Sequence, residues 1–219
     1  MSTNAQIDLY TWKTPNGRKV SILLEELGLA YDVHAVDISK DEQFAPEFLK
    51  IAPNNKIPAI VDRRHAEPVS VFETGAIMAY LCETTPGGER FWPTTPAARA
   101  EVHQWLMWQM GGVGPFFGRT YRFLNKRPKD PENGRWVADE FLDEATRLLK
   151  VLDGQLKKTG AFMSSTGYSI ADMATWTWVN GLLDVFAKER PELGQLEHVK
   201  RWRENVGARH AVQKGNAIP

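Results

Sequence analysis

Four adjacent residues, Thr14-Pro15-Asn16-Gly17, place a hydroxyl group, an amide and a flexible backbone at the start of a predicted helix. Proline suits this first turn because the N–H group that it lacks would have no acceptor within the helix. The unpaired N–H groups of the turn carry about half a positive charge and attract anions. Thr14 and Asn16 are therefore candidates for holding a thiolate or a carboxylate. Alternatively, either residue serves only as the N-cap of the helix.

A second segment, NKIPAI over residues 55–60, follows a loop and carries Pro58 at the start of a predicted strand. A cis Ile57–Pro58 bond there would leave the backbone N–H and C=O of Ile57 free to pair with an extended peptide. The alternative is a proline at the edge of a sheet, without any ligand. Taken alone, this segment does not distinguish the two.

A third segment, FETGAI over residues 72–77, places Glu73 and Thr74 where a predicted strand gives way to a helix. The helix start and the Thr74 hydroxyl could receive a carboxylate, while Glu73 could receive an ammonium group. Thr74 could also be a cap alone. Together, the three segments offer places for a thiolate, a peptide backbone and an amino-acid head group. Glutathione is one small molecule that has all three.

The elements that carry these segments alternate between strand and helix in the first third of the chain. Residues 62–67 are rich in charged side chains and predict a hairpin loop between two short strands. The predicted order is βαβαββα, with strands over 7–11, 31–37, 57–61 and 68–72 and helices from the TPNG turn to Gly28, over 47–51 and over 73–81.

Apolar positions after residue 93 recur with the spacing of helices only. Proline and glycine are frequent between residues 86 and 93, so we divide the chain into a domain over 1–87 and an all-helical domain over 94–219. Within the helical domain, Ser169 and Asp172 fit a capping box, and the apolar run that follows predicts a buried central helix.

Composition narrows the classes of function. The 219 residues contain 27 basic and 27 acidic residues, so bulk charge suggests no nucleic-acid or membrane partner. A single cysteine, Cys82, fits a reducing cytosol, and five scattered histidines predict no metal site. The polar residues before the first strand resemble no signal peptide, so we expect a cytoplasmic protein.

The segments TPNGRKV, PNNKIPAIVD, FETGAI, WLMWQMGGVGP and SIAD together resemble the cytosolic glutathione S-transferase family over nearly the whole chain. Within that family they resemble the nu-class, or Ure2-like, bacterial branch. The resemblance implies a thioredoxin-like domain followed by a helical domain, glutathione as co-substrate, and a homodimer. It also implies that disulfides are reduced more than electrophiles are detoxified.

The resemblance assigns a role to particular residues. Thr14 and Asn16 would stabilise the glutathione sulfur in place of an activating tyrosine, serine or cysteine. The implied contacts with the rest of glutathione are those of Ile57 and Pro58 with the cysteinyl residue, Glu73 and Thr74 with the γ-glutamyl end, and Gln43 and Lys56 with the glycyl end.

For two of the roles in binding glutathione, the sequence offers more than one candidate residue. Tyr10 is a rival to Thr14, because tyrosine-type relatives carry their activating hydroxyl at the end of this strand. Relatives also clamp a glutathione carboxylate with an arginine from the helical domain. Glu140 stands near that place here, and the arginines that could substitute are Arg119, Arg122 and Arg135.

Two further functions stay open. The first is conjugation of glutathione to an electrophile, in an acceptor pocket lined by Trp108, Met110, Phe116, Phe117 and Tyr121. The second is a catalytically quiet glutathione-binding regulator. For disulfide reduction, the chain lacks a C-x-x-C pair and Cys82 is expected to be packed, so two glutathione molecules must supply both sulfurs.

Overall fold

The computed structural model of this protein describes residues 5–125 and 131–219. The chain forms two compact units. The first comprises residues 1–92 together with 208–219, and the second comprises residues 93–207. The first boundary between the units lies within the segment over residues 86–93 that is rich in proline and glycine.

The first unit contains a four-stranded sheet in the order β2-β1-β3-β4. Strand β1 (Ile7–Thr11) pairs in parallel with β2 (Tyr31–Ala35) and antiparallel with β3 (Ala59–Asp62). Strand β4 (Val69–Phe72) completes the predicted hairpin with β3. The four strands and three helices follow the predicted order βαβαββα, although β2 ends two residues early and β3 begins two residues late.

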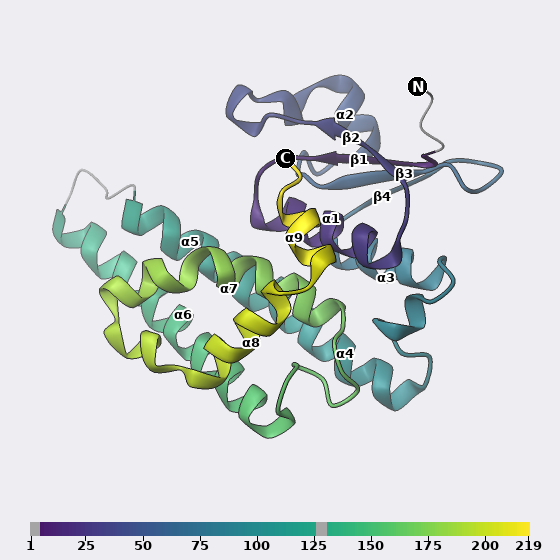
Figure 1. The fold of residues 1–219 in the computed structure, drawn as a ribbon. Helices are drawn as coiled ribbons and strands as arrows, with labels where there is room; N and C mark the ends of the chain where they lie inside the picture. Colours follow the sequence, from purple (N-terminus) through teal and green to yellow (C-terminus); the bar gives the residue numbers. More distant parts are fainter. Residues whose placement is uncertain (1–4, 126–130) are drawn as a thin grey trace. The chain divides into compact units, whose positions relative to one another are not determined.

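Helices cover both faces of this sheet (Figure 1). Helices α1 (Pro15–Leu27) and α3 (Thr74–Glu83) lie on one face, and α2 (Pro46–Ile51) lies on the other. Residues at alternate positions of β1 are buried, as expected for a strand with one apolar face. Helix α1 ends at Gly28, whose left-handed φ of 67° suits glycine. Two short 3₁₀ turns, Ile38–Lys40 and Glu42–Phe44, precede α2.

The C-terminal helix α9 (His210–Asn216) packs against α1 within the first unit. Gly215 permits this close approach, because a Cβ atom there would lie 2.6 Å from the Cα of Ile22. The Ser21 hydroxyl donates a hydrogen bond to the Gly215 carbonyl at 2.7 Å, and Arg209 forms an ion pair with Glu26 at 2.6 Å. The sequence-based division had placed residues 208–219 in the helical domain, whereas here they belong to the compact unit of the sheet.

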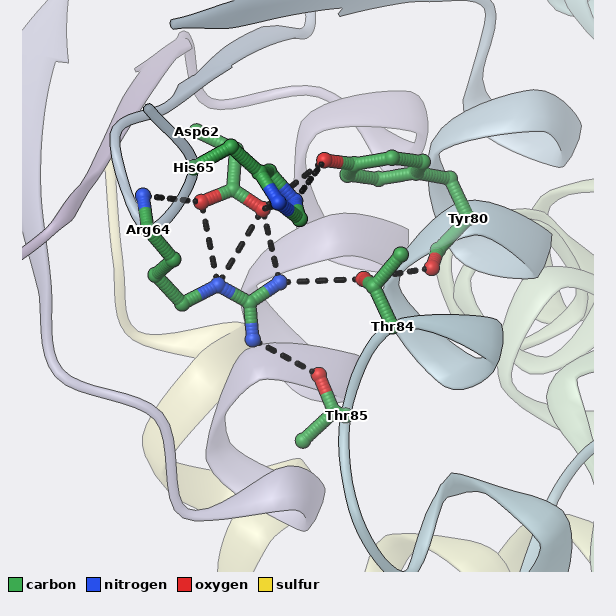
Figure 2. A network of polar contacts seen from close by, with 6 residues as sticks. All are labelled: Asp62, Arg64, His65, Tyr80, Thr84 and Thr85. Atoms are coloured by element: carbon green, nitrogen blue, oxygen red, sulfur yellow. Dashed lines mark hydrogen bonds and ion pairs between the residues drawn. The ribbon is translucent and has the colours of Figure 1, made fainter. Parts of the chain in front are cut away.

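A polar network joins the end of β3 to the end of α3 (Figure 2). Asp62 is fully buried and forms an ion pair with Arg64 at 2.7 Å. The Tyr80 hydroxyl donates to Asp62 at 3.0 Å, and Arg64 donates to Thr84 at 3.0 Å. Burial alone would raise the pKa of Asp62, but the hydrogen bonds from Arg64 and Tyr80 hold that pKa below its usual range. The network therefore fixes the C-terminal end of the helix that begins at Thr74.

The second unit is helical. Its α-helices are α4 (Pro96–Trp108), α5 (Gly114–Asn125), α6 (Pro131–Thr159), α7 (Ile170–Glu189) and α8 (Glu197–Gly207). A π-helical segment, Gln109–Val113, joins α4 to α5, and short 3₁₀ turns lie at Gly88–Arg90 in the first unit and Pro191–Gln195 in the second. In the described ranges, no helix is long and apolar enough to cross a membrane.

Helix α7 is the buried central helix that the sequence predicted. Its capping box is present, because the Asp172 carboxylate accepts the Ser169 backbone N–H at 3.0 Å. Asp172 also accepts hydrogen bonds from the Met163 N–H and the Trp202 indole, each at 2.9 Å. Asp172 thus serves the packing of this unit rather than catalysis.

Candidate functional site

A pocket of about 130 Å³ opens in the first unit, where α1, β3 and α3 begin and β4 ends. Six residues that the sequence analysis proposed as glutathione contacts line it, together with one that it missed. The lining residues are Asn16, Lys56, Ile57, Pro58, Phe72, Glu73 and Thr74. Phe72 could have been anticipated from its place directly before Glu73.

The first of these elements is the TPNG turn at the start of α1. Thr14 is the N-cap of the helix, and its hydroxyl oxygen accepts the Gly17 backbone N–H at 3.1 Å. Asn16 occupies the second position of the helix and lines the pocket, whereas Thr14 is not among the lining residues. Gly17 has no room for a side chain, because a Cβ atom there would lie 2.5 Å from the Trp12 carbonyl oxygen. The glycine therefore keeps the turn tight.

The second element is the segment that enters β3. The Ile57–Pro58 peptide bond is cis, which is one of the two alternatives that the sequence leaves open, and both residues line the pocket. Pro58 leads into Ala59, which is buried in a small apolar cluster with Phe48 and Ala52 of the α2 region. This packing fixes the position of the segment that lines the pocket.

Tyr10, the rival to Thr14, is partly buried and packs against that same apolar cluster. Its ring stacks on His34 with centroids 4.6 Å apart and lies 6.3 Å from the ring of Phe48. The pKa of its phenol is raised, and burial is the largest cause. Tyr10 thus takes part in packing on the α2 face, and it is not among the residues that line the pocket.

The third element is the junction between β4 and α3. Glu73 has a positive φ of 70° with ψ of 119°, a backbone conformation that is rare for a residue with a side chain. Such strain tends to persist at functional sites, where the surrounding structure enforces it. The Asn54 side-chain amide donates to the Glu73 carboxylate at 3.3 Å and so holds it at the pocket. Sequence reasoning missed this contribution of Asn54.

Thr74 is the first residue of α3 and is buried, with 6% of its surface exposed. Its hydroxyl oxygen accepts a hydrogen bond from the Lys19 ammonium group at 3.3 Å. Lys19 comes from α1 and is almost wholly buried, with 1% of its surface exposed. Burial lowers the pKa of Lys19 to about 7, and the nearby Glu73 carboxylate opposes that shift.

The two residues proposed for the glycyl end lie in different places. Lys56 lines the pocket and is exposed. Gln43 lies in the 3₁₀ turn before α2, where its amide donates to Asp41 at 3.4 Å, and it is not among the lining residues.

Other candidates for chemistry lie outside the pocket. Cys82 is buried on α3, and burial raises the pKa of its thiol to about 12. Phe117, proposed for an acceptor pocket, is fully buried against Phe186 in the second unit. Within residues 5–125 and 131–219, the structure contains no cluster of side chains suited to a metal ion.

Comparison with known proteins identifies the family. The profile of the glutathione S-transferase N-terminal domain matches residues 5–83, and that of the C-terminal domain matches residues 112–210. The disulfide-bond oxidoreductase YfcG of Escherichia coli K12 is 41% identical over 94% of this chain and 92% of its own length. The chain belongs to the glutathione S-transferase family. Its sheet unit and its helical unit are thus the thioredoxin-like and helical domains of a glutathione S-transferase.

Solved structures of other glutathione transferases support this assignment. One from Pseudomonas putida, with one glutathione disulfide bound per subunit, is 40% identical with a TM-score of 0.89, covering 100% of this chain and 94% of that one. A family member from Pseudomonas fluorescens Pf-5, with two glutathione molecules bound, is also 40% identical with a TM-score of 0.89, over 100% and 96% of the two chains. Relatives in this family therefore bind both the reduced and the oxidised form of the tripeptide.

Proposed function

We propose that this glutathione S-transferase uses glutathione to reduce disulfides and belongs to the nu-class branch. The proposal rests mainly on one observation, which is that Asn16, Ile57, Glu73 and Thr74 line the same pocket. These groups match a sulfur, a peptide backbone and an amino-acid head group respectively. Lys56 is a cation at the same pocket and would bind the glycyl carboxylate.

Glutathione binding follows from the chemistry of each group. The Glu73 carboxylate would pair with the γ-glutamyl ammonium, and the Thr74 hydroxyl with the start of α3 would receive the γ-glutamyl carboxylate. The backbone of Ile57 would pair with the cysteinyl residue. The sulfur would then lie at the start of α1, where Asn16, the Thr14 hydroxyl and the helix N–H groups favour a thiolate.

Because the chain has no reactive cysteine, glutathione must supply the electrons that reduce the substrate disulfide. Cys82 is the only cysteine, and a thiol with a pKa of about 12 is protonated at neutral pH. One glutathione thiolate would attack the substrate disulfide, forming a mixed disulfide and releasing one substrate thiolate. A second glutathione thiolate would attack the mixed disulfide, giving glutathione disulfide and the other substrate thiolate. The two glutathione molecules supply both electrons, and solvent protonates the products.

Relatives support this reaction over simple conjugation. YfcG is named a disulfide-bond oxidoreductase, and the Pseudomonas structures contain either glutathione disulfide or two glutathione molecules. A site that accepts two tripeptides, or the disulfide of two, suits the mixed-disulfide sequence. Conjugation requires one tripeptide and an electrophile.

The test compares two activities of the purified protein. We expect reduction of a small hydroxyalkyl disulfide by glutathione, followed by coupling the glutathione disulfide formed to glutathione reductase and NADPH. Asn16→Ala should slow this turnover by roughly 10- to 1,000-fold, the usual effect of removing one donor to a reacting anion. Cys82→Ala should leave turnover unchanged. Conjugation of a chloronitrobenzene without disulfide reduction would favour the transferase function, and binding without either activity would favour a regulator.

We also propose that the protein is a cytoplasmic homodimer. A single free cysteine suits a reducing compartment, and two-fold dimers are the commonest soluble oligomers. Size-exclusion chromatography with light scattering measures the mass directly. A monomer mass at micromolar concentration would contradict the dimer.

A further inference from the structure

Helix α1 is buried on every side at its middle, whereas a helix that covers one face of a sheet ordinarily exposes its outer face. Val20, Leu23 and Leu24 are fully buried, as expected for residues that face the sheet. Ser21 and Ile22 are buried too, with 1% and 0% of their surface exposed. Helix α9, which follows the helical unit in the sequence, lies against these two residues (Figure 1).

Backbone atoms form the contact between α1 and α9. A Cβ atom at Gly215 would lie 2.6 Å from both the N and the Cα atoms of Ile22, and 2.8 Å from the carbonyl carbon of Ser21. Non-bonded carbon atoms normally lie about 3.5–4.0 Å apart, so a single methyl group would force the helices apart by about 1 Å. Gly215 lies within a helix, where alanine is the better helix former. The proximity of α1, rather than the conformation of α9, therefore explains the glycine.

Polar contacts fix α9 along the length of α1. The Ser21 hydroxyl donates to the Gly215 carbonyl at 2.7 Å. Helix α1 also contributes two acidic residues that ion pairs join to α9. These pairs are Glu25 with Lys214 at 2.7 Å and Glu26 with Arg209 at 2.6 Å, and the two glutamate side chains are only 11% and 7% exposed. Helix α9 therefore cannot slide along α1 without breaking these contacts.

The same contact lies close to the proposed sulfur site along the helix. Asn16, which lines the pocket, is five residues before Ser21, or about 7.5 Å along the axis of α1. Close-packed interiors transmit strain, so a shift of α1 at Ser21 also moves its first turn. Groups that act on reacting atoms must be held within about 0.5 Å, and a misplacement of about 1 Å can lower the rate about a hundredfold.

We propose that α9 is a positioning element of the sulfur site, because its contact at Gly215 and Ser21 holds Asn16 and the start of α1 in place. This inference rests on the proposed binding of glutathione in the pocket. Gly215 and Ser21 are not among the residues that line the pocket, so they act through α1. The proposed head-group contacts, Glu73 and Thr74, come from a different element, the start of α3.

The test separates the sulfur of glutathione from the rest of the ligand. S-Methylglutathione keeps the head group and the peptide backbone but has no thiol that can ionise. For the parent and Gly215→Ala, calorimetry measures the dissociation constant of S-methylglutathione, and ultraviolet absorbance of the thiolate measures the pKa of the bound glutathione thiol. The coupled reductase assay gives kcat and KM. Gly181→Ala in α7 is the matched control, because an added Cβ atom there would meet no other part of the described chain within 4 Å.

We expect Gly215→Ala to raise the pKa of the bound thiol and to lower kcat by about ten- to a hundredfold, because the donors at the start of α1 are displaced from the sulfur. The dissociation constant of S-methylglutathione should change by less than about threefold, since the contacts of α3 remain. Gly181→Ala should match the parent in every measurement. A purely structural role of Gly215 would lower stability but leave the thiol pKa of the folded protein unchanged.

An unchanged thiol pKa and kcat in folded Gly215→Ala would overturn the role of α9. A loss of about tenfold or more in affinity for S-methylglutathione would also overturn it, because the contact would then support the whole pocket. If Gly215→Ala does not fold, Ser21→Ala removes the hydrogen bond to α9 without adding an atom and should also raise the thiol pKa. Parent-like values in Ser21→Ala would then contradict the inference. Failure of the parent to bind S-methylglutathione would instead overturn the proposed function.

Discussion

The Thr14 hydroxyl oxygen accepts the Gly17 backbone N–H at 3.1 Å, which makes Thr14 the N-cap of α1. This hydrogen bond uses a lone pair of the oxygen and leaves the hydroxyl proton available. Capping the helix and donating to a sulfur atom are therefore compatible, although the sequence alone presents them as alternatives.

Replacing Thr14 separates these two contributions. Thr14→Ala should lower the free energy of unfolding by about 1 kcal/mol through loss of the cap. It should also reduce disulfide turnover without abolishing it, because Asn16 and the helix N–H groups remain. Thr14→Ser should keep both stability and turnover. Urea unfolding and the coupled reductase assay measure the two effects. Complete loss of activity in Tyr10→Phe, with both Thr14 variants active, would show instead that the enzyme depends on tyrosine.

Replacing Glu73 tests the head-group site. Glu73→Gln keeps an oxygen that can accept from Asn54 but removes the negative charge that would pair with the γ-glutamyl ammonium. Glutathione affinity should fall by about tenfold or more, the usual size of a charge-assisted hydrogen bond. Calorimetry measures the dissociation constant, with Glu67→Gln on the exposed hairpin loop as the control. Identical constants for the parent and Glu73→Gln would mean that Glu73 is structural.

The buried ammonium of Lys19 predicts a pH dependence of stability. Its pKa is lowered by burial to about 7, whereas a lysine in the unfolded chain has a pKa of about 10.4. Between these values the unfolded state binds more protons, so the lysine makes the free energy of unfolding rise with pH, by at most about 1.4 kcal/mol per pH unit.

Ligand-free parent and Lys19→Met proteins would be unfolded in urea at pH 7, 8 and 9. The free energy of unfolding of the parent, relative to that of the variant, should increase across the series. A difference that does not change with pH would indicate that Lys19 keeps an ordinary pKa.

The Asp62 network predicts that replacing Arg64 lowers the free energy of unfolding more than replacing the adjacent Arg63 does. Arg64→Met removes the arginine that forms an ion pair with the fully buried Asp62 and should cost about 3 kcal/mol of stability. Arg63 pairs with Asp8, but its side chain is 53% exposed, so Arg63→Met should cost about 1 kcal/mol or less. Urea unfolding of both variants makes the comparison. Similar losses for the two would contradict a stabilising role of the network at the end of α3.

The sequence by itself determined the features that depend on near neighbours. Strand alternation in residues 7–11, the stop of α1 at Gly28 and the capping box of Ser169 with Asp172 are all local, and each is present. The cis Ile57–Pro58 bond is one of two alternatives that the sequence allows, because a peptide bond before proline has only a small preference for the trans form. The order of elements then followed from periodicity, which neighbouring side chains impose.

The tertiary structure alone decided which distant groups meet. Lys19 and Thr74 are 55 positions apart, and Ser21 and Gly215 are 194 apart, so no local pattern pairs them. The periodicity of α1 marks Val20, Leu23 and Leu24 as core residues but gives no sign that a lysine is buried beside them. The strained φ of Glu73 likewise arises because β4 and α3 are each fixed by their own packing. Such contacts depend on how helices and strands pack together, which only the folded chain specifies.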